Sequence, residues 1–154
     1  MIIPLNISQG LIYVLATVRI PNWRVYGIVK FFVDTGSPKT FIGEQDAIRL
    51  QMRLSRIDYT ERARMGGTSI SIGEIKDDVQ LYFKTDKESI HVKPERFFVS
   101  KGMWVKDGMV SPNPSILGYD FLFENKFALH YNPSENTAYL ERKEQATVQP
   151  ITQP

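Results

Sequence analysis

Residues 30–37 read Lys-Phe-Phe-Val-Asp-Thr-Gly-Ser, so an apolar run ends directly in an acid, two hydroxyl residues and a glycine. The run predicts a buried strand that delivers Asp34 to a sharp turn at the edge of the core. Amide and hydroxyl donors can fix both oxygens of a carboxylate in such a turn, and Gly36 allows the backbone to approach closely. A carboxylate held in this way can activate a water molecule. The same residues also fit an ordinary Asx-type turn at the end of a strand.

The flanking segments have the two-residue periodicity of β-strands rather than that of helices. Leu11–Ile20 and Val25–Val33 are rich in Val, Ile, Tyr and Phe and are bounded by turn-forming residues, so both are predicted strands. Further short strands are predicted at residues 57–64, 69–75, 79–85, 90–92, 96–99, 127–131 and 137–141. So many short strands predict a mainly β domain, either a closed barrel or a sandwich.

Helix is expected in two short segments. The charged, helix-forming stretch from Glu44 to Met52 predicts one helix. A second helical turn is predicted at Asp120, whose carboxylate would cap the amides of Phe121 and the residues after it. Residues 143–154 are polar and carry two prolines, which predicts a flexible tail after a folded domain at residues 1–142.

The composition limits the chemistry that the chain can carry. Its 154 residues fit one domain, and 42% hydrophobic with 23% charged residues predicts a chain that can bury a core. There is no cysteine, and the two histidines, His91 and His130, are far apart in sequence. Disulfides and thiolate nucleophiles are therefore excluded, little is left for a zinc site or a Ser-His relay, and no metal or cofactor is expected.

The charge and hydropathy patterns argue against two kinds of partner. The 19 Lys and Arg residues are scattered among 17 Asp and Glu residues, so no basic cluster for nucleic acid is expected. No stretch approaches the roughly 18–20 consecutive apolar residues of a membrane span, and no basic N-terminal region precedes a long apolar run. We therefore expect a soluble, cytoplasmic protein with no membrane span and no nucleic-acid partner.

The sequence resembles the retropepsin-like (retroviral-type) aspartic proteases from about Leu11 to Arg142. Four features in matching order carry the resemblance: Val33-Asp-Thr-Gly-Ser37 followed by Phe41-Ile42, the helix-like residues 43–50, Arg64-Met-Gly-Gly-Thr-Ser69 between two predicted strands, and Ser115-Ile-Leu-Gly-Tyr-Asp-Phe121. The third resembles the flap hairpin that closes over substrate, although Gly66-Gly67 alone also fits an ordinary hairpin turn. The resemblance implies a closed β-barrel of the retroviral-type acid protease fold, with one or two short helices, acting as a homodimer.

The single Asp-Thr-Gly motif determines how many chains the expected active site needs. Peptide hydrolysis by water without a metal needs one group that takes a proton and another that donates one. Two carboxyl groups about 3 Å apart can do both, because their repulsion makes them share a proton. The chain has one Asp-Thr-Gly, so a second copy would supply the other carboxyl group on a two-fold axis. Asp120 could instead act as a second acid within the chain, but we expect it to cap the helix.

The resemblance also implies a role for each residue of the turn. Asp34 would be the catalytic acid and base, once from each subunit. Thr35 would hydrogen-bond across the axis, and Gly36 would allow the turn and donate its amide. Ser37 would hydrogen-bond the outer carboxylate oxygen. The protein is therefore expected to be an aspartic endopeptidase.

Two further motifs are expected to surround this turn. The flap tip would consist of Met65, Gly66, Gly67 and Thr68. Its backbone would bind an extended polypeptide substrate in a tunnel with apolar pockets, and its closure would exclude water. The structural motif beneath the catalytic turn would be Ile116, Leu117 and Gly118, which also fit an ordinary buried strand.

The chain departs from the viral members of the family in length. It has additional residues between His91 and Pro114 and a helix after the catalytic turn, which resembles the cellular and microbial single-domain branch. The sequence therefore does not determine the dimer interface, although the predicted strand at residues 137–141 could form it. Two other functions are considered: a non-catalytic peptide-binding or scaffolding domain with the same fold, and a nucleic-acid-binding β-barrel whose aromatic strand residues are more simply explained as core.

Overall fold

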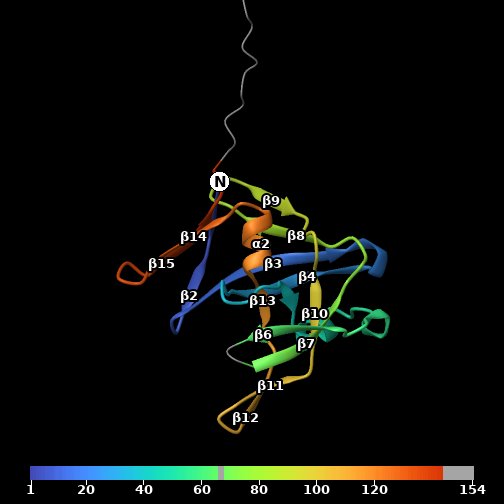
Figure 1. Cartoon of the computed structure of the whole chain (residues 1–154). Coiled ribbons are helices and arrows are strands. Elements are labelled where there is room, and N and C mark those ends of the chain that lie inside the picture. The colour runs from blue at the N-terminus through green and yellow to red at the C-terminus, as the bar shows by residue number, and fades with distance from the viewer. Residues whose placement is uncertain (66–67, 144–154) are drawn as a thin grey trace, which may run out of the picture.

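The computed structural model describes residues 1–65 and 68–143, which form a mainly β structure (Figure 1). The strands are β1 (Ile2–Pro4), β2 (Asn6–Ser8), β3 (Leu11–Ile20), β4 (Val25–Val33), β5 (Phe41–Ile42), β6 (Glu61–Met65), β7 (Thr68–Glu74), β8 (Gln80–Lys84), β9 (Ser89–Val92), β10 (Phe98–Lys101), β11 (Met103–Lys106), β12 (Met109–Pro112), β13 (Ser115–Leu117), β14 (Ala128–Asn132) and β15 (Thr137–Glu141). Two short helices, α1 (Glu44–Arg49) and α2 (Tyr119–Glu124), lie among these described residues. Apart from Lys143, the predicted tail at residues 143–154 lies outside them.

The central feature is a sheet with the strand order β6-β7-β10-β5-β13-β4-β3-β8-β9, to which β2 adds by pairing with β3. The expected closed barrel is not found: within the described residues the two end strands, β6 and β9, pair only with β7 and β8. The strands β6, β7, β10 and β5 are joined to the rest of this sheet by few pairs. The strand β5 has two residues and pairs with β13 only through Phe41↔Ile116. The sheet therefore wraps around its core without a continuous ladder that would close it.

The strands β3 and β4 have the predicted bounds and form the long antiparallel pair on which the core is built. Alternate residues of β3 are buried, among them Val14, Val18 and Ile20, as expected for a strand with one face toward the core. Phe31 of β4 is fully buried and packs edge-on against Phe97. Each such side chain contributes on the order of 2 kcal/mol by leaving water, so this pair supports the strand end that carries Asp34.

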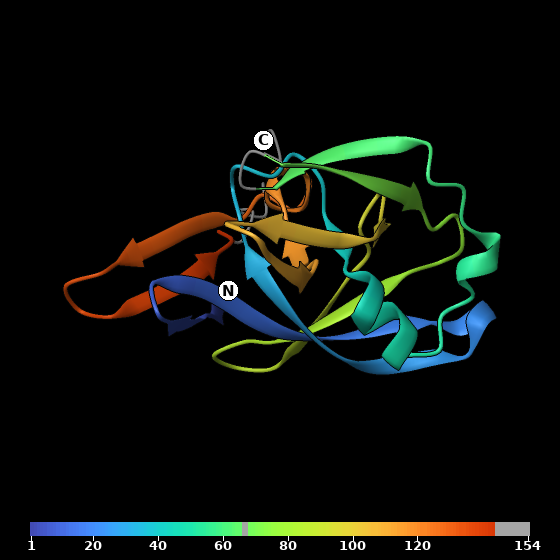
Figure 2. The ribbon, with the colours of Figure 1, turned by 90° about the horizontal axis from the view of Figure 1, so that it is seen from below.

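The two ends of the described chain form a separate sheet of order β1-β15-β14. Ile3 of β1 is paired with Leu140 of β15, and both side chains are fully buried. Both edges of β15 are therefore occupied within its own chain, so this strand is not free to pair with a second copy as the sequence suggested. Figure 2 shows the β14–β15 hairpin extending away from the rest of the molecule.

Within the extra residues between His91 and Pro114, residues 103–112 form a hairpin that the sequence did not predict. Strands β11 and β12 pair only with each other in the described part of the chain, in the register Met103↔Pro112 to Lys106↔Met109. This two-stranded sheet lies beyond β6 and β7 at the lower end of the view in Figure 1.

Both predicted helices are present with different bounds. The helix α1 ends at Arg49 rather than at Met52, because Gln51 adopts a left-handed conformation with φ 55° that stops the helix. The helix α2 starts at Tyr119, one residue before the predicted start, and Gly118 is its N-cap residue. No helix in the described ranges has the length and apolar character needed to cross a bilayer.

Candidate active site

Asp34 follows the last residue of β4, where the parallel partner strand β13 also ends. The register pairs Val33 with Leu117, and the amide of Asp34 donates to the carbonyl oxygen of Leu117 at 3.1 Å. The side chain of Asp34 is half-buried. The predicted motif at residues 116–118 therefore lies directly beside the strand end that positions the carboxylate.

A tight turn orients the Asp34 carboxylate. The amide of Gly36 donates to Oδ1 of Asp34 at 2.9 Å, and the amide of Ser37 donates to the carbonyl oxygen of Asp34 at 3.1 Å. A Cβ atom on Gly36 would lie 3.2 Å from the same Oδ1, so a larger residue would crowd the carboxylate. Thr35 is exposed at the surface of the turn.

Ser37 differs from the sequence expectation in its hydrogen bond. Its side chain is fully buried, and its hydroxyl donates to the carbonyl oxygen of Lys39 at 2.9 Å rather than to the Asp34 carboxylate. The hydroxyl therefore stabilises the turn through a bond to its own backbone. In the single chain, the donor that the structure gives to the carboxylate of Asp34 is the amide of Gly36.

Thr40 and Asp120, which the sequence analysis did not connect, fasten the turn to α2. The hydroxyl of Thr40 donates to Oδ1 of Asp120 at 2.6 Å and accepts from the amide of Gly118 at 2.8 Å. The amide of Thr40 donates to Oδ2 of Asp120 at 3.1 Å. The signal available in the sequence was a Thr shortly after the motif and an acid two residues after Gly118, but 80 residues separate the partners.

The expected capping role of Asp120 is therefore only part of its function. Its Oδ1 does accept from the amide of Phe121 at 2.7 Å, but its other contacts go to Thr40 and not to a turn of helix. Gly118 is needed beside it for a steric reason: a Cβ atom there would lie 2.3 Å from the carbonyl oxygen of Lys39. The amide of Tyr119 completes the junction by donating to the carbonyl oxygen of Ser37 at 2.7 Å.

A cleft of about 530 Å³ opens at the carboxylate of Asp34. Its lining is mostly apolar and comes from the start of β3, the end of β4, the end of β12 and β13: Gly10, Leu11, Ile12, Phe32, Val33, Asp34, Ser111, Pro112, Pro114 and Ile116. Among the described residues of this lining, Asp34 is the one with an ionisable side chain. The arrangement can therefore hold apolar side chains of a ligand beside a single carboxylate.

The β6–β7 hairpin, in which the sequence predicts a flap, is described except for its tip. Strands β6 and β7 pair in the register Glu61↔Ile72 to Met65↔Thr68, while Gly66 and Gly67 lie outside the described residues. Its buried side chains Ala63 and Ile70 belong to a small apolar cluster with Ile116, which also lines the cleft. The hairpin is thus packed onto the wall of the cleft, and Met65 and Thr68 are the described residues nearest its tip.

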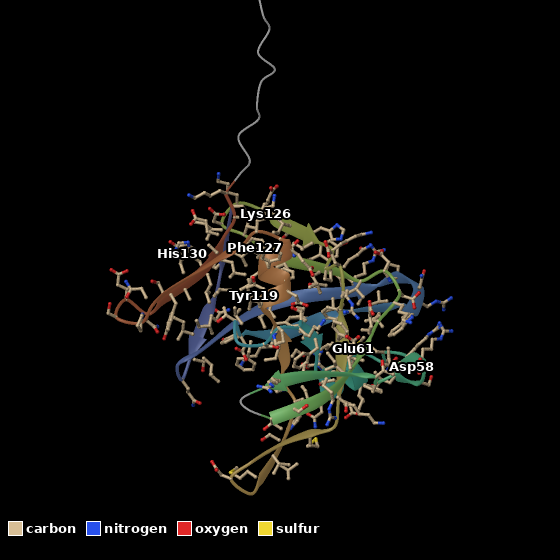
Figure 3. The ribbon with its side chains drawn as sticks, viewed as in Figure 1. Asp58, Glu61, Tyr119, Lys126, Phe127 and His130 are labelled. Carbon is tan, nitrogen blue, oxygen red and sulfur yellow. The ribbon has the colours of Figure 1, made fainter. Side chains whose placement is uncertain are left out.

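An ion-pair network holds the base of the same hairpin. Arg96 contacts Glu61 at 2.7 Å and Glu74 at 3.0 Å, and these are the first residue of β6 and the last of β7. The hydrogen bond from Arg96 lowers the pKa of Glu74 below its usual range. Figure 3 places Glu61 on the side of the molecule away from His130 of the β14–β15 hairpin. Within the described residues, no group of three or more His, Asp or Glu is arranged to hold a metal ion.

Comparisons with known proteins support the fold. No family model matches the sequence, and no curated protein matches it. Among solved structures, a retropepsin-like aspartic protease from Rickettsia conorii is similar with a TM-score of 0.55 and 22% identity, covering 91% of this chain and 88% of that one. The retroviral protease-like domain of Ddi1 from Leishmania major matches with a TM-score of 0.40 and 17% identity, over 87% of this chain and 98% of that one. The similarity to the Rickettsia conorii structure shows that the chain has a retropepsin-like fold.

Proposed function

We propose that this chain is one subunit of a homodimeric aspartic endopeptidase. The observation that carries the proposal is the position of Asp34, a half-buried carboxylate held by the Gly36 amide at the mouth of an apolar cleft. The retropepsin-like fold and the Asp-Thr-Gly-Ser motif support the same chemistry. Substrates would be polypeptides that bind in an extended conformation.

A second carboxyl group has to come from another copy of the chain. Asp120 is a poor candidate within the chain, because its two oxygens already accept hydrogen bonds from Thr40 and from the amide of Phe121. Within residues 1–65 and 68–143, the lining of the cleft offers no carboxyl group besides Asp34. A two-fold axis beside Asp34 would bring two equivalent carboxyl groups together, and the exposed Thr35 could then hydrogen-bond across the axis.

The reaction then follows from the shared proton of the pair. One Asp34 carboxylate takes a proton from a water molecule, whose oxygen attacks the peptide carbonyl carbon, while the other carboxyl group donates its proton to the carbonyl oxygen. Collapse of the tetrahedral intermediate breaks the C–N bond, and a proton passes to the leaving amine. The β6–β7 hairpin would contribute backbone hydrogen bonds to the extended substrate and exclude bulk water.

A proteolysis assay tests this proposal. Wild-type protein and Asp34→Asn are incubated with an unfolded polypeptide from about pH 3 to 7, across a range of protein concentrations, with and without a pepstatin-type inhibitor. General acid–base catalysis contributes roughly 10² to 10⁴ in rate, so Asp34→Asn should lower cleavage by at least about a hundredfold. If both proteins give the same products, or none, at concentrations where sedimentation shows a dimer, proteolysis is excluded.

A non-catalytic peptide-binding domain is the second candidate. The observation that favours it is the Ser37 hydroxyl, which donates to Lys39 and leaves the Asp34 carboxylate with the Gly36 amide as its donor in the single chain. An apolar cleft can bind an extended peptide without hydrolysing it. Peptide binding that is unchanged in Asp34→Asn, by a protein that remains monomeric at high concentration and does not cleave, would favour this candidate over the first.

A further inference from the structure

The β11–β12 hairpin has one face that is apolar and exposed. Its antiparallel register places Met103 opposite Pro112 and Val105 opposite Val110, so these four side chains share a face. We call them the hairpin face. Met103, Val105 and Val110 are 48%, 56% and 61% exposed, and Pro112 is also exposed. Such a contiguous apolar set on a surface usually marks a place where another molecule binds.

The hairpin is fixed at its base, although its strands have no other strand partner in the described part of the chain. The amide of Gly102 donates to the carboxylate of Glu44 on α1 at 2.8 Å. The side-chain amide of Asn113, which is 3% exposed, donates to the carbonyl oxygen of Gly102 at 3.1 Å and so joins the two ends of the hairpin. An isolated two-stranded sheet is only marginally stable in water, so this attachment to α1 sets where the hairpin face lies.

The hairpin face is continuous with the Asp34 cleft. Pro112, the last residue of β12, belongs to the face and also lines the cleft, together with its neighbours Ser111 and Pro114. Val110 lies two residues before Pro112 on the same face, and Val105 lies opposite Val110, so the hairpin face leads away from the rim of the cleft. The distance between successive same-face pairs of a strand is about 7 Å, which is also the spacing of alternate side chains in an extended polypeptide.

We propose that the hairpin face is an additional binding surface for the substrate, and that it takes apolar side chains of an extended polypeptide outside the segment around the cut bond. This inference rests on the proposed function and narrows its substrate class to chains with alternating apolar residues that reach beyond the cleft. A second copy is a less suitable occupant, because a partner seated on this face would cover Pro112 and with it the rim of the cleft.

The consequence for specificity is a dependence on substrate length. Four-residue strands span about 13 Å, so a substrate needs roughly four residues beyond the cleft to reach the tip of the hairpin. Short peptides that fill only the cleft gain nothing from the hairpin face. Longer peptides gain only if the added residues are apolar at alternate positions.

Binding can be measured independently of cleavage in Asp34→Asn protein. The probes are two fluorescein-labelled peptides of about twelve residues, one with alternating Leu and Thr throughout and one in which the residues outside the central six are Ser and Gly. The test variant carries Val105→Ser and Val110→Ser in the Asp34→Asn background. The matched control is Met109→Ser in the same background, since Met109 is 72% exposed but lies on the opposite face of the hairpin.

We expect the alternating peptide to bind the double-serine variant about tenfold more weakly than the control, while the ratio of affinities for the two peptides falls toward one. Equal affinities for variant and control would overturn the inference, and so would failure of both peptides to bind. A third outcome, in which sedimentation shows that the serine substitutions weaken self-association while peptide affinity is unchanged, would assign the face to a second copy. Because Asp34→Asn protein is used throughout, these results do not depend on whether the wild-type protein cleaves.

Discussion

Replacing Thr40 by Val tests whether the hydrogen bonds between α2 and the turn at Asp34 support the proposed active site. The side chain is 1% exposed, and its hydroxyl both accepts from the buried amide of Gly118 and donates to Asp120 at 2.6 Å. Val has nearly the same shape but neither function. A buried group left without its partner costs about 1–3 kcal/mol, and a lost bond to a charged group about 1.5–3 kcal/mol.

The two losses share one hydroxyl, and Asp120 keeps the amides of Thr40 and Phe121 as donors. We therefore expect Thr40→Val to lower the free energy of unfolding by about 3 kcal/mol, near the lower end of the summed range of about 2.5–6 kcal/mol. For a chain of this size that corresponds to a fall in Tm of roughly 6–12 °C. Urea denaturation at pH 7 gives the free energy, and calorimetry gives the Tm.

The matched control for this substitution is Thr40→Ser, which keeps the hydroxyl and removes one methyl group. It should cost only about 1 kcal/mol, because the hydrogen bonds remain. A Thr40→Val protein that is no less stable than Thr40→Ser would refute the reasoning that the hydroxyl fastens the turn. Activity measured at a temperature where both variants are folded then reports on the position of Asp34 alone.

Four other substitutions test the carboxylate, the junction with α2 and the base of the β6–β7 hairpin. Asp34→Asn should lower peptide cleavage at least about a hundredfold, whereas Asp120→Asn should retain cleavage. Loss of cleavage in both variants, when both are folded, would contradict the assignment of Asp34 as the one catalytic acid that each chain supplies. Gly118→Ala should cost on the order of 3 kcal/mol in urea denaturation, because its Cβ would lie 2.3 Å from the Lys39 carbonyl oxygen; a neutral effect would mean that the turn moves freely. Arg96→Gln should lower stability at neutral pH by less than about 1 kcal/mol, and the difference should fade as the pH falls below 4.5, the usual pKa of a Glu carboxyl group. The sign follows from Glu74: Arg96 lowers its pKa in the folded state, so the stabilisation exists where the carboxylate is charged and is lost as acid protonates it. A difference in thermal melts that does not shrink at any pH below 4.5 would refute this cause.

The long strands and the turn that follows Val33 could be predicted because their signals are local. Leu11–Ile20 and Val25–Val33 have enough residues to show alternating burial, and the turn at Asp34 follows directly from the second of them. Short strands lack this signal. The strand β5 has two residues, and it is a strand because Phe98 and Ile116 lie on either side of Phe41.

Long-range contacts explain the predictions that were wrong. Closure of the sheet into a barrel depends on whether β6 and β9 meet, and nothing in either segment encodes that distance. The link between Thr40 and Asp120 joins residues 80 positions apart through one hydroxyl. The donor preference of Ser37 was also misjudged, because its own turn brings the Lys39 carbonyl oxygen to 2.9 Å.

The terminal sheet has a consequence for how the proposed enzyme would be controlled. The amide of Arg142 donates to the carbonyl oxygen of Met1 at 3.0 Å, so the two ends of the described domain are joined within one molecule. In the proposed dimer, each chain would complete its terminal sheet by itself and would still lack half of the catalytic pair. Catalysis would then depend on protein concentration, whereas folding would not. Dilution would inactivate the enzyme without unfolding it, and a local increase in concentration would activate it without any chemical modification.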